Sequence, residues 1–298
     1  MKTRHFLSLA DFTQDELLSL IQRARQMKKG VGGAKVPAKV LDGKYIGLIF
    51  EKPSTRTRVS FEVGIRQLGG QSIFLSRRDI QLGRGEPIKD TARILSRYLD
   101  GLVIRTFGHH IIEEFAEWSS IPVVNALTDL LHPCQVLGDL MTLQERGLDI
   151  TKMNAAWIGD GNNMANSWIN AAKVLGFRLA LACPEGYDPG VDFNVSNVAL
   201  TRDPAKAASG ADVISTDVWA SMGWEDEADQ RREVFRNYQV NGALLQKAAQ
   251  NVFVLHCLPA HRGEEITDEV MESSCSLVWD QAENRLHIQK AILELLFR

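Results

Sequence analysis

The chain has 298 residues, of which 45% are hydrophobic and 24% charged, as is typical of a globular protein. Its length suggests two domains of about 150 residues each. The net charge of −3 argues against a nucleic-acid-binding protein, and the absence of any apolar stretch of 18 residues argues against a membrane protein.

Cysteine use and the first residues indicate the compartment. The chain starts Met-Lys-Thr-Arg-His, without the apolar run of a signal peptide, so we expect a cytoplasmic protein with reduced thiols. The cysteines lack zinc-finger spacing, which argues against a structural metal; they are Cys134, Cys183, Cys257 and Cys275. Residues 1–149 carry a net charge of +4 and residues 150–298 a net charge of −7, a weak indication of an anionic ligand in the first half and a cationic one in the second.

The first elements in chain order are a capped helix, a surface loop and a buried strand. Thr13 followed by Glu16 forms the pattern of a capping box, which predicts a helix beginning there. Residues 28–44 contain Gly, Lys and Pro and are expected to form a surface loop. The apolar residues 45–50 then predict a buried parallel strand.

The segment Ser54-Thr55-Arg56-Thr57-Arg58 follows this strand and precedes a helix that ends at Gly69-Gly70. Its hydroxyls and guanidiniums fall on the first turn of that helix, where backbone N–H groups and the helix dipole favour an anion. The number of donors favours a phosphate over a single carboxylate. The alternative is a capped helix start, by Ser54 or Thr55, with two solvated arginines.

Further candidates in the first half come from the predicted strand and helix ends. Strands are predicted at 72–75, 101–104 and 122–124, and helices from Asp90, at 111–118 and at 132–146. Arg105 follows a strand, at the edge where open α/β sheets bind ligands. His132 and Gln135 begin the helix at 132–146, as ligand-binding residues or, for His132, as a cap or a satisfied surface group. The loop at 77–87 is either functional or a surface connection.

The second half repeats the alternation of strands and helices. Strands are predicted at 155–158, 179–183, 212–215, 252–255 and 277–279, and a last helix at 286–297. Gly159 and Gly161 resemble part of a dinucleotide fingerprint, but Met164 replaces its third glycine, which argues against a nicotinamide cofactor. Asp217, at a strand's carboxyl end, is a candidate partner for an amine, or alternatively an N-cap or turn residue.

This alternation predicts an α/β protein with two doubly wound, parallel-sheet, Rossmann-like domains joined by crossover helices. We expect the first domain at residues 1–131, with the C-terminal helix 286–298 packing back onto it, and the second at residues 132–285. Phosphate binding in the first half and amine binding in the second would suit a group transfer that relies on proximity and electrostatic stabilisation.

Three ordered motifs resemble the aspartate/ornithine carbamoyltransferase family over nearly the whole chain: Ser54-Thr55-Arg56-Thr57-Arg58, His132-Pro133-Cys134-Gln135 and His256-Cys257-Leu258-Pro259. The last motif, and Asp217-Val218-Trp219 followed by Ser221-Met222-Gly223, are similar to the family's ornithine branch. The resemblance implies transfer of the carbamoyl group of carbamoyl phosphate to an amine, giving citrulline and phosphate when ornithine accepts. It implies no metal or organic cofactor and a homotrimer with active sites at subunit interfaces.

The resemblance also implies residue roles. Thr57, Arg105, His132 and Cys257 are the expected catalytic residues. The first three would polarise the carbamoyl oxygen, and Gln135 would hold the carbamoyl NH₂. The expected carbamoyl phosphate site comprises Ser54, Thr55, Arg56, Thr57, Gln81 (reaching a neighbouring subunit), Arg105, His132, Gln135, Cys257, Leu258 and Arg285. Asn163, Asp217, Ser221 and Met222 would hold the α-amino and carboxylate groups of ornithine, and Cys257 and Leu258 would meet its side-chain amine.

Two kinds of alternative remain. Trp224, after the Ser-Met-Gly turn, could change the acceptor to putrescine or an N-acyl-ornithine. Asp217, however, suits a free α-ammonium, and Ser221 and Met222 suit a carboxylate. A non-catalytic carbamoyl-phosphate-binding relative would be expected to have lost a polarising residue, and the matched positions are intact.

Overall fold

The computed structural model describes residues 3–30, 39–76, 80, 85–220 and 227–298, which form two compact units. Unit 1 comprises residues 1–141 and 284–298, and unit 2 comprises residues 142–283. The chain crosses between the units within helix α5 (Pro133–Glu145) and again within helix α11 (Val278–Phe297). The units therefore differ from the expected division at 131/132 and 285/286, because most of α5 packs with the first unit.

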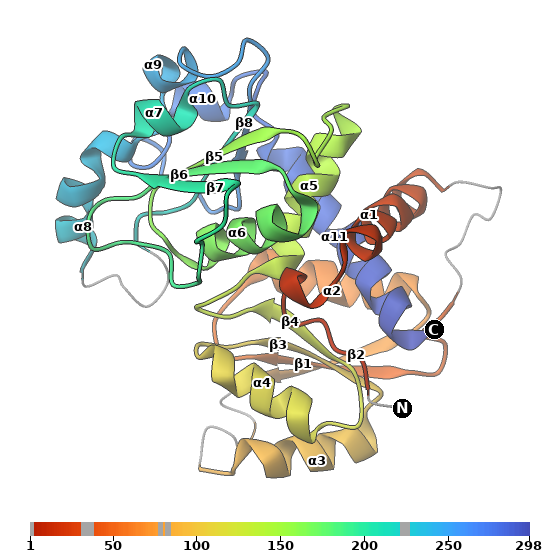
Figure 1. Ribbon diagram of the computed structural model, residues 1–298. Helices are drawn as coiled ribbons and strands as arrows, with labels where there is room; N and C mark the ends of the chain where they lie inside the picture. Colours follow the sequence, from red (N-terminus) through yellow and green to blue (C-terminus); the bar gives the residue numbers. More distant parts are fainter. Residues whose placement is uncertain (1–2, 31–38, 77–79, 81–84, 221–226) are drawn as a thin grey trace. The chain divides into compact units, whose positions relative to one another are not determined.

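Unit 1 is built on a parallel sheet with the strand order β2-β1-β3-β4. Figure 1 shows α3 and α4 side by side on one face of this sheet and α2 on the other. Besides parts of α5 and α11, its elements are η1 (Leu9–Asp11), α1 (Gln14–Lys29), β1 (Tyr45–Phe50), α2 (Thr55–Gln67), β2 (Gln71–Ser76), α3 (Ile88–Tyr98), β3 (Gly101–Arg105), α4 (His109–Trp118) and β4 (Val123–Leu127).

The core of unit 1 explains this layering. Ile49, Leu102 and Ile104 of the sheet pack against Ala92 of α3 and Phe115 of α4, and all five side chains are buried. The predicted capping box is confirmed, because Thr13 Oγ1 accepts from Glu16 N while Glu16 accepts from Thr13 N. Helix α3 begins at Ile88, after Pro87, two residues before the expected Asp90.

Unit 2 is built on a second parallel sheet, with the strand order β7-β6-β5-β8-β9. Its elements are β5 (Asn154–Ile158), α6 (Asn163–Leu175), β6 (Arg178–Ala182), β7 (Val198–Thr201), α7 (Pro204–Ala208), β8 (Val213–Thr216), α8 (Ala228–Phe235), η4 (Arg236–Tyr238), α9 (Gly242–Leu245), β9 (Phe253–His256) and α10 (Asp268–Met271). Both sheets are parallel and covered by helices, as the sequence predicted.

One predicted strand is wrong. Residues 277–279 were expected to form the last strand, but the chain makes one bridge, between Val254 and Ser276, and then enters α11 at Val278. A short apolar run does not distinguish a strand from a helix start. Helix α11 therefore begins eight residues before the expected position 286, and Arg285 lies inside it rather than before it.

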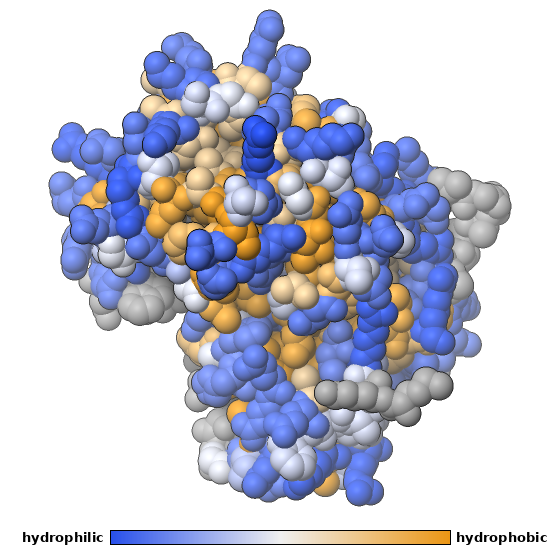
Figure 2. Space-filling view, in the orientation of Figure 1, coloured by the Kyte–Doolittle hydropathy of each residue, from blue (hydrophilic) through white to orange (hydrophobic). Residues whose placement is uncertain are grey.

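The surface carries the expected polar side chains. On the face drawn in Figure 2, hydrophilic side chains stand outermost in both units, with hydrophobic ones visible between them. In the described part of the chain, no helix is both long and apolar enough to span a membrane.

Candidate active site

The first turn of α2 presents the predicted anion donors. It follows β1, and β1 adjoins β3 at the point where the strand order of the first sheet reverses, which is where open α/β sheets bind ligands. Ser54 is the N-cap, since its Oγ accepts from Thr57 N at 3.2 Å. No acidic side chain lies in this turn. The positive end of the helix dipole is thus available to an external anion.

The two arginines of this turn differ in their surroundings. Arg58 forms an ion pair with Glu62 at 2.9 Å and lies over the Phe74 ring, 3.6 Å from its centroid. Arg56 is partly buried and has no polar partner among the residues that the structure describes. Arg58 is therefore engaged by the fold, and Arg56 is the guanidinium available to a ligand.

Behind this turn, unit 1 gathers buried cations around a histidine. Arg105 at the end of β3, His132 before α5 and Arg285 in α11 are each at most 5% exposed. Arg285 Nη2 donates to Thr57 Oγ1 at 2.5 Å, which connects α11 to the first turn of α2. Burial, followed by the charges of Arg285 and Arg105, holds the pKa of His132 well below its usual value of 6.5. His132 is therefore a neutral hydrogen-bonding group beside two guanidiniums.

The neutral state of His132 predicts a pH dependence of stability. Below about pH 6.5 the unfolded chain protonates this residue while the folded chain does not, so the free energy of unfolding falls as pH falls. One proton corresponds to a slope of at most about 1.4 kcal/mol per pH unit. In His132→Gln this slope should disappear. Denaturant unfolding at pH 7.5 and 5.5 measures it, with the same change at the exposed His110 as control; equal acid losses in wild type and His132→Gln would contradict the assignment.

Unit 2 has a polar cluster at the corresponding place in its own sheet, between β5 and β8, where its strand order reverses. Asp217 follows β8 and is 8% exposed. Its Oδ1 accepts from Cys257 Sγ at 3.0 Å and from Val218 N at 2.8 Å, and its Oδ2 accepts from Asn162 Nδ2 at 2.9 Å. The fold thus brings together the predicted Asp217 and Cys257, and adds Asn162.

Gly161, which follows β5, is required by packing. A Cβ at Gly161 would lie 2.4 Å from backbone atoms of Asp188 and Pro189, so only glycine fits there. Asn162 caps α6, because its Oδ1 accepts from Met164 N and Ala165 N. Asn163, the residue expected to bind ornithine, is the first residue of α6 and partly buried. Packing therefore accounts for Gly161 without a dinucleotide.

The segment after β9 is held by a buried histidine. His256 Nδ1 accepts from Leu258 N at 2.9 Å, so its proton lies on Nε2, which donates to Glu265 Oε1 at 2.9 Å. Both side chains are completely buried. Leu258 has a φ of 59°, in the left-handed region that non-glycine residues seldom adopt. The bond from its N–H to His256 helps to hold this conformation next to Cys257.

Asp217, His256 and Cys257 are close enough together to be considered as metal ligands. Ligand atoms of Asp217, His256 and Cys257 lie within 4.8 Å of one another. Both nitrogens of His256 are already used, one accepting from a backbone N–H and one donating to Glu265. As folded, this group is a hydrogen-bond network with no imidazole lone pair to offer a metal ion.

A second buried charge network lies beside this cluster. Arg231 Nη1 donates to Asp160 Oδ2 at 2.8 Å and to Trp219 O at 2.9 Å, and its Nε bonds Glu227 at 3.2 Å. Burial raises the pKa of Asp160 to about 6, although the charge of Arg231 opposes the shift. The network joins residues on either side of 221–226. Two predicted ornithine-binding residues, Ser221 and Met222, and the predicted Gln81 lie outside the described residues.

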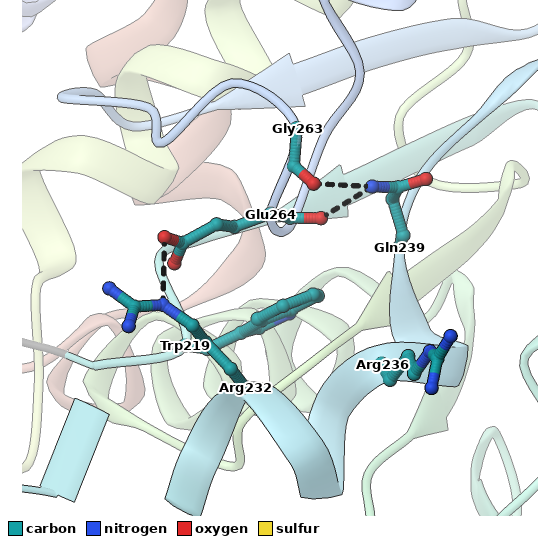
Figure 3. Close-up of a pocket in the computed structure, with 6 residues that line it drawn as sticks. All are labelled: Trp219, Arg232, Arg236, Gln239, Gly263 and Glu264. Atoms are coloured by element: carbon teal, nitrogen blue, oxygen red, sulfur yellow. Dashed lines mark hydrogen bonds and ion pairs between the residues drawn. The ribbon is translucent and has the colours of Figure 1, made fainter. Parts of the chain in front are cut away.

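Figure 3 shows a pocket in unit 2 that contains none of the predicted site residues. It is lined by Trp219, Arg232, Arg236, Gln239, Gly263 and Glu264. Its charges are largely used within the fold: Arg232 Nε donates to Glu264 Oε1 at 3.0 Å, and Gln239 Nε2 donates to the carbonyls of Gly263 and Glu264 (Figure 3). The pocket therefore belongs to the packing around α8.

Sequence reasoning missed several residues of these networks. Asn162 was passed over for its neighbour Asn163, although a polar residue immediately before a helix is a recognisable N-cap signal. Glu265 lies nine residues after His256 in an irregular segment, where no local pattern marks it as part of a site. Its partner His256 is known only from the fold.

Comparison with known proteins agrees with these features. Residues 4–145 match the family model of the aspartate/ornithine carbamoyltransferase carbamoyl-P binding domain, and residues 151–296 match that of the Asp/Orn binding domain. The chain is 55% identical over 299 residues to the anabolic ornithine carbamoyltransferase of Pseudomonas aeruginosa, covering 99% of this chain and 98% of the relative.

Solved structures with this fold include the ornithine carbamoyltransferase from Pyrococcus furiosus, with a TM-score of 0.92, 47% identity and coverage of 97% of this chain and 96% of that one. An N-acetyl-L-ornithine transcarbamylase has a TM-score of 0.85 and 30% identity, with coverage of 98% and 99%. The chain belongs to the aspartate/ornithine carbamoyltransferase family.

Proposed function

We propose that this protein is an ornithine carbamoyltransferase, which transfers the carbamoyl group of carbamoyl phosphate to the side-chain amine of L-ornithine and releases L-citrulline and phosphate. The observation that carries the proposal is the pairing of two sites in one chain. Unit 1 gathers buried guanidiniums around the neutral His132, and unit 2 holds Asp217 against Cys257. The full-length similarity to ornithine carbamoyltransferases supports it.

In unit 1, carbamoyl phosphate would bind at the first turn of α2. Backbone N–H groups, hydroxyls and Arg56 are suited to bind the phosphate dianion. The turn contains no acidic side chain that would repel it. Thr57, Arg105 and His132 would donate to the carbamoyl oxygen, where negative charge develops as the amine attacks. Gln135 would accept from the carbamoyl NH₂. Ser54, Thr55, Gln81 and Arg285 complete the proposed phosphate site, with Cys257 and Leu258 at the carbamoyl group.

In unit 2, Asp217 and Asn163 would hold the α-ammonium of ornithine, together with Ser221 and Met222 for the carboxylate. The side-chain amine, near Cys257 and Leu258, must be neutral to attack, whereas an alkylammonium has a pKa of roughly 10. Attack forms the new C–N bond, the C–O bond to phosphate breaks with its electron pair leaving on phosphate, and the attacking nitrogen loses a proton, which the departing phosphate takes up. The groups described above supply orientation and charge stabilisation for this step.

The assembly and cellular setting follow from the same proposal. We expect a homotrimer in which Gln81 reaches the phosphate site of a neighbouring subunit, a cytoplasmic location and a role in arginine biosynthesis. The resemblance of the motifs is the basis for the homotrimer, and the similarity to an anabolic relative supports the role in arginine biosynthesis.

Citrulline formation from carbamoyl phosphate tests the proposal directly. Ornithine, putrescine and N-acetylornithine are run in parallel, and ornithine should give a kcat/KM at least about 100-fold above either rival, because the rivals leave a buried charged or polar partner unsatisfied. A preference for N-acetylornithine, the acceptor named in the relative with 30% identity, would show that the proposed acceptor is wrong and that the proposed carbamoyl transfer is right. No product with any of the three amines would refute the transferase itself.

A further inference from the structure

Two completely buried side chains of α5, Gln135 and Asp139, form a pair one helical turn apart. Gln135 Nε2 donates to Asp139 Oδ1 at 2.9 Å. Gln135 Oε1 is buried as well and has no hydrogen-bond partner among the described residues. One end of this amide is thus fixed by the fold, and the other end is an acceptor without a donor.

The chemistry of the pair determines which end of the amide is fixed. An ionised carboxylate accepts hydrogen bonds and cannot donate one, whereas an amide offers an NH₂ donor at one end and a carbonyl acceptor at the other. In the structure Gln135 turns its NH₂ toward Asp139 Oδ1, and an ionised Asp139 requires this orientation. Rotation of the Gln135 amide by 180° would place its carbonyl oxygen against the carboxylate. Both groups are buried, and an unsatisfied buried polar group is costly.

We infer that Asp139 is a positioning residue that makes Gln135 present only a hydrogen-bond acceptor, and that this pair selects a carbamoyl group over an acetyl group. The inference rests on the proposed function, in which Gln135 meets the carbamoyl NH₂. Carbamoyl phosphate supplies a donor for the buried Oε1. Acetyl phosphate, with a methyl group of similar size in that place, leaves the acceptor unsatisfied.

This selection should be measurable as a ratio of affinities. An unsatisfied buried acceptor weakens binding by roughly 10- to 100-fold, so wild-type protein should bind carbamoyl phosphate tighter than acetyl phosphate by about that factor. Inorganic phosphate reports on the α2 turn alone. Its affinity separates damage to the phosphate site from loss of the carbamoyl contact.

The variant Asp139→Asn removes the constraint at nearly constant volume, since an asparagine can donate to Gln135 Oε1 and stabilise the reversed amide. The carbamoyl-to-acetyl affinity ratio should fall at least about tenfold, whereas the affinity for inorganic phosphate should change by less than about twofold. Calorimetry with the three phosphates measures both. If Asp139→Asn does not fold, Asp139→Ser, whose hydroxyl also donates, carries the same expectation.

Cys134→Ser is the matched control, because Cys134 is buried on the same turn of α5 and donates instead to Asn125 O. It should keep the wild-type ratio. An unchanged ratio in Asp139→Asn, in a protein that makes citrulline and discriminates as wild type, would overturn the inference and leave the proposed function intact. Wild-type protein that neither forms citrulline nor prefers carbamoyl phosphate would overturn the proposed function instead.

Discussion

Arg56→Ala should lower kcat/KM for carbamoyl phosphate by about 10²- to 10³-fold and weaken carbamoyl phosphate binding, with little change in thermal stability. Loss of one preorganised donor to developing or bound negative charge has effects of this size. Arg56 lies on the first turn of α2, where the helix dipole and the missing acid leave positive charge uncompensated. Because it has no polar partner in the described part of the chain, its removal breaks no hydrogen bond or ion pair there.

Arg58→Ala is the control for this experiment. It removes the same charge two residues later, but its guanidinium is paired with Glu62 and lies over Phe74. Loss of such an exposed ion pair changes stability by at most about 1 kcal/mol, and carbamoyl phosphate binding should change by less than about fivefold. Equal losses in the two variants would mean that the turn acts through net charge alone. Unchanged kinetics in Arg56→Ala would return the turn to a simple capped helix start.

Features that depend on local chemistry could be predicted from the sequence. Ser54 is a good N-cap, and parallel strands are continuous apolar runs, so the strand–turn–helix unit around the predicted anion site could be placed before its structure was known. Arg105 was expected at a strand's carboxyl end, and β3 ends at that residue. At these positions, the local sequence is sufficient to predict the local structure.

Features that depend on tertiary packing could not. Residues 277–279 are apolar enough for a strand, but Leu277 and Val278 are both buried and Trp279 is 57% exposed, which is not the alternation of a half-buried strand, and the helix begins at Val278. Strand β7 was not among the predicted strands. It is only four residues long and lies at the sheet edge, so its sequence shows little periodicity. Charge states belong to the same class: nothing near His132 in the sequence predicts that its imidazole is buried beside Arg105 and Arg285 and kept neutral.

The second large effect is expected at Asp217. Asp217→Asn should raise KM for ornithine by about 30- to 150-fold and leave carbamoyl phosphate binding unchanged. The substitution removes the negative charge that a substrate ammonium requires, and a hydrogen bond between charged groups contributes about 2–3 kcal/mol. It also places an NH₂ among groups that already donate, Asn162 Nδ2 and Cys257 Sγ.

Asp212→Asn is the matched control, because Asp212 precedes β8 as Asp217 follows it. Asp212 accepts from the backbone N–H of Asn154 at 2.8 Å, at the amino end of the strands, where open α/β sheets do not bind ligands. This variant can lose stability, but its KM for ornithine should stay within about twofold of wild type. A rise equal to that of Asp217→Asn would show that the effect arises from the strand as a whole.

Comparing acceptors decides which amine Asp217 recognises. If it holds the α-ammonium, Asp217→Asn should impair ornithine and leave the weak activity with N-acetylornithine, which lacks that charge, nearly unchanged. Asp217 could instead act on the side-chain amine, because its Oδ1 lies 3.0 Å from the Sγ of Cys257, which is expected near that amine. Equal losses with both acceptors would move Asp217 to the reacting nitrogen. The carboxylate would then orient the nucleophile through Cys257, and acceptor choice would depend on residues outside this cluster.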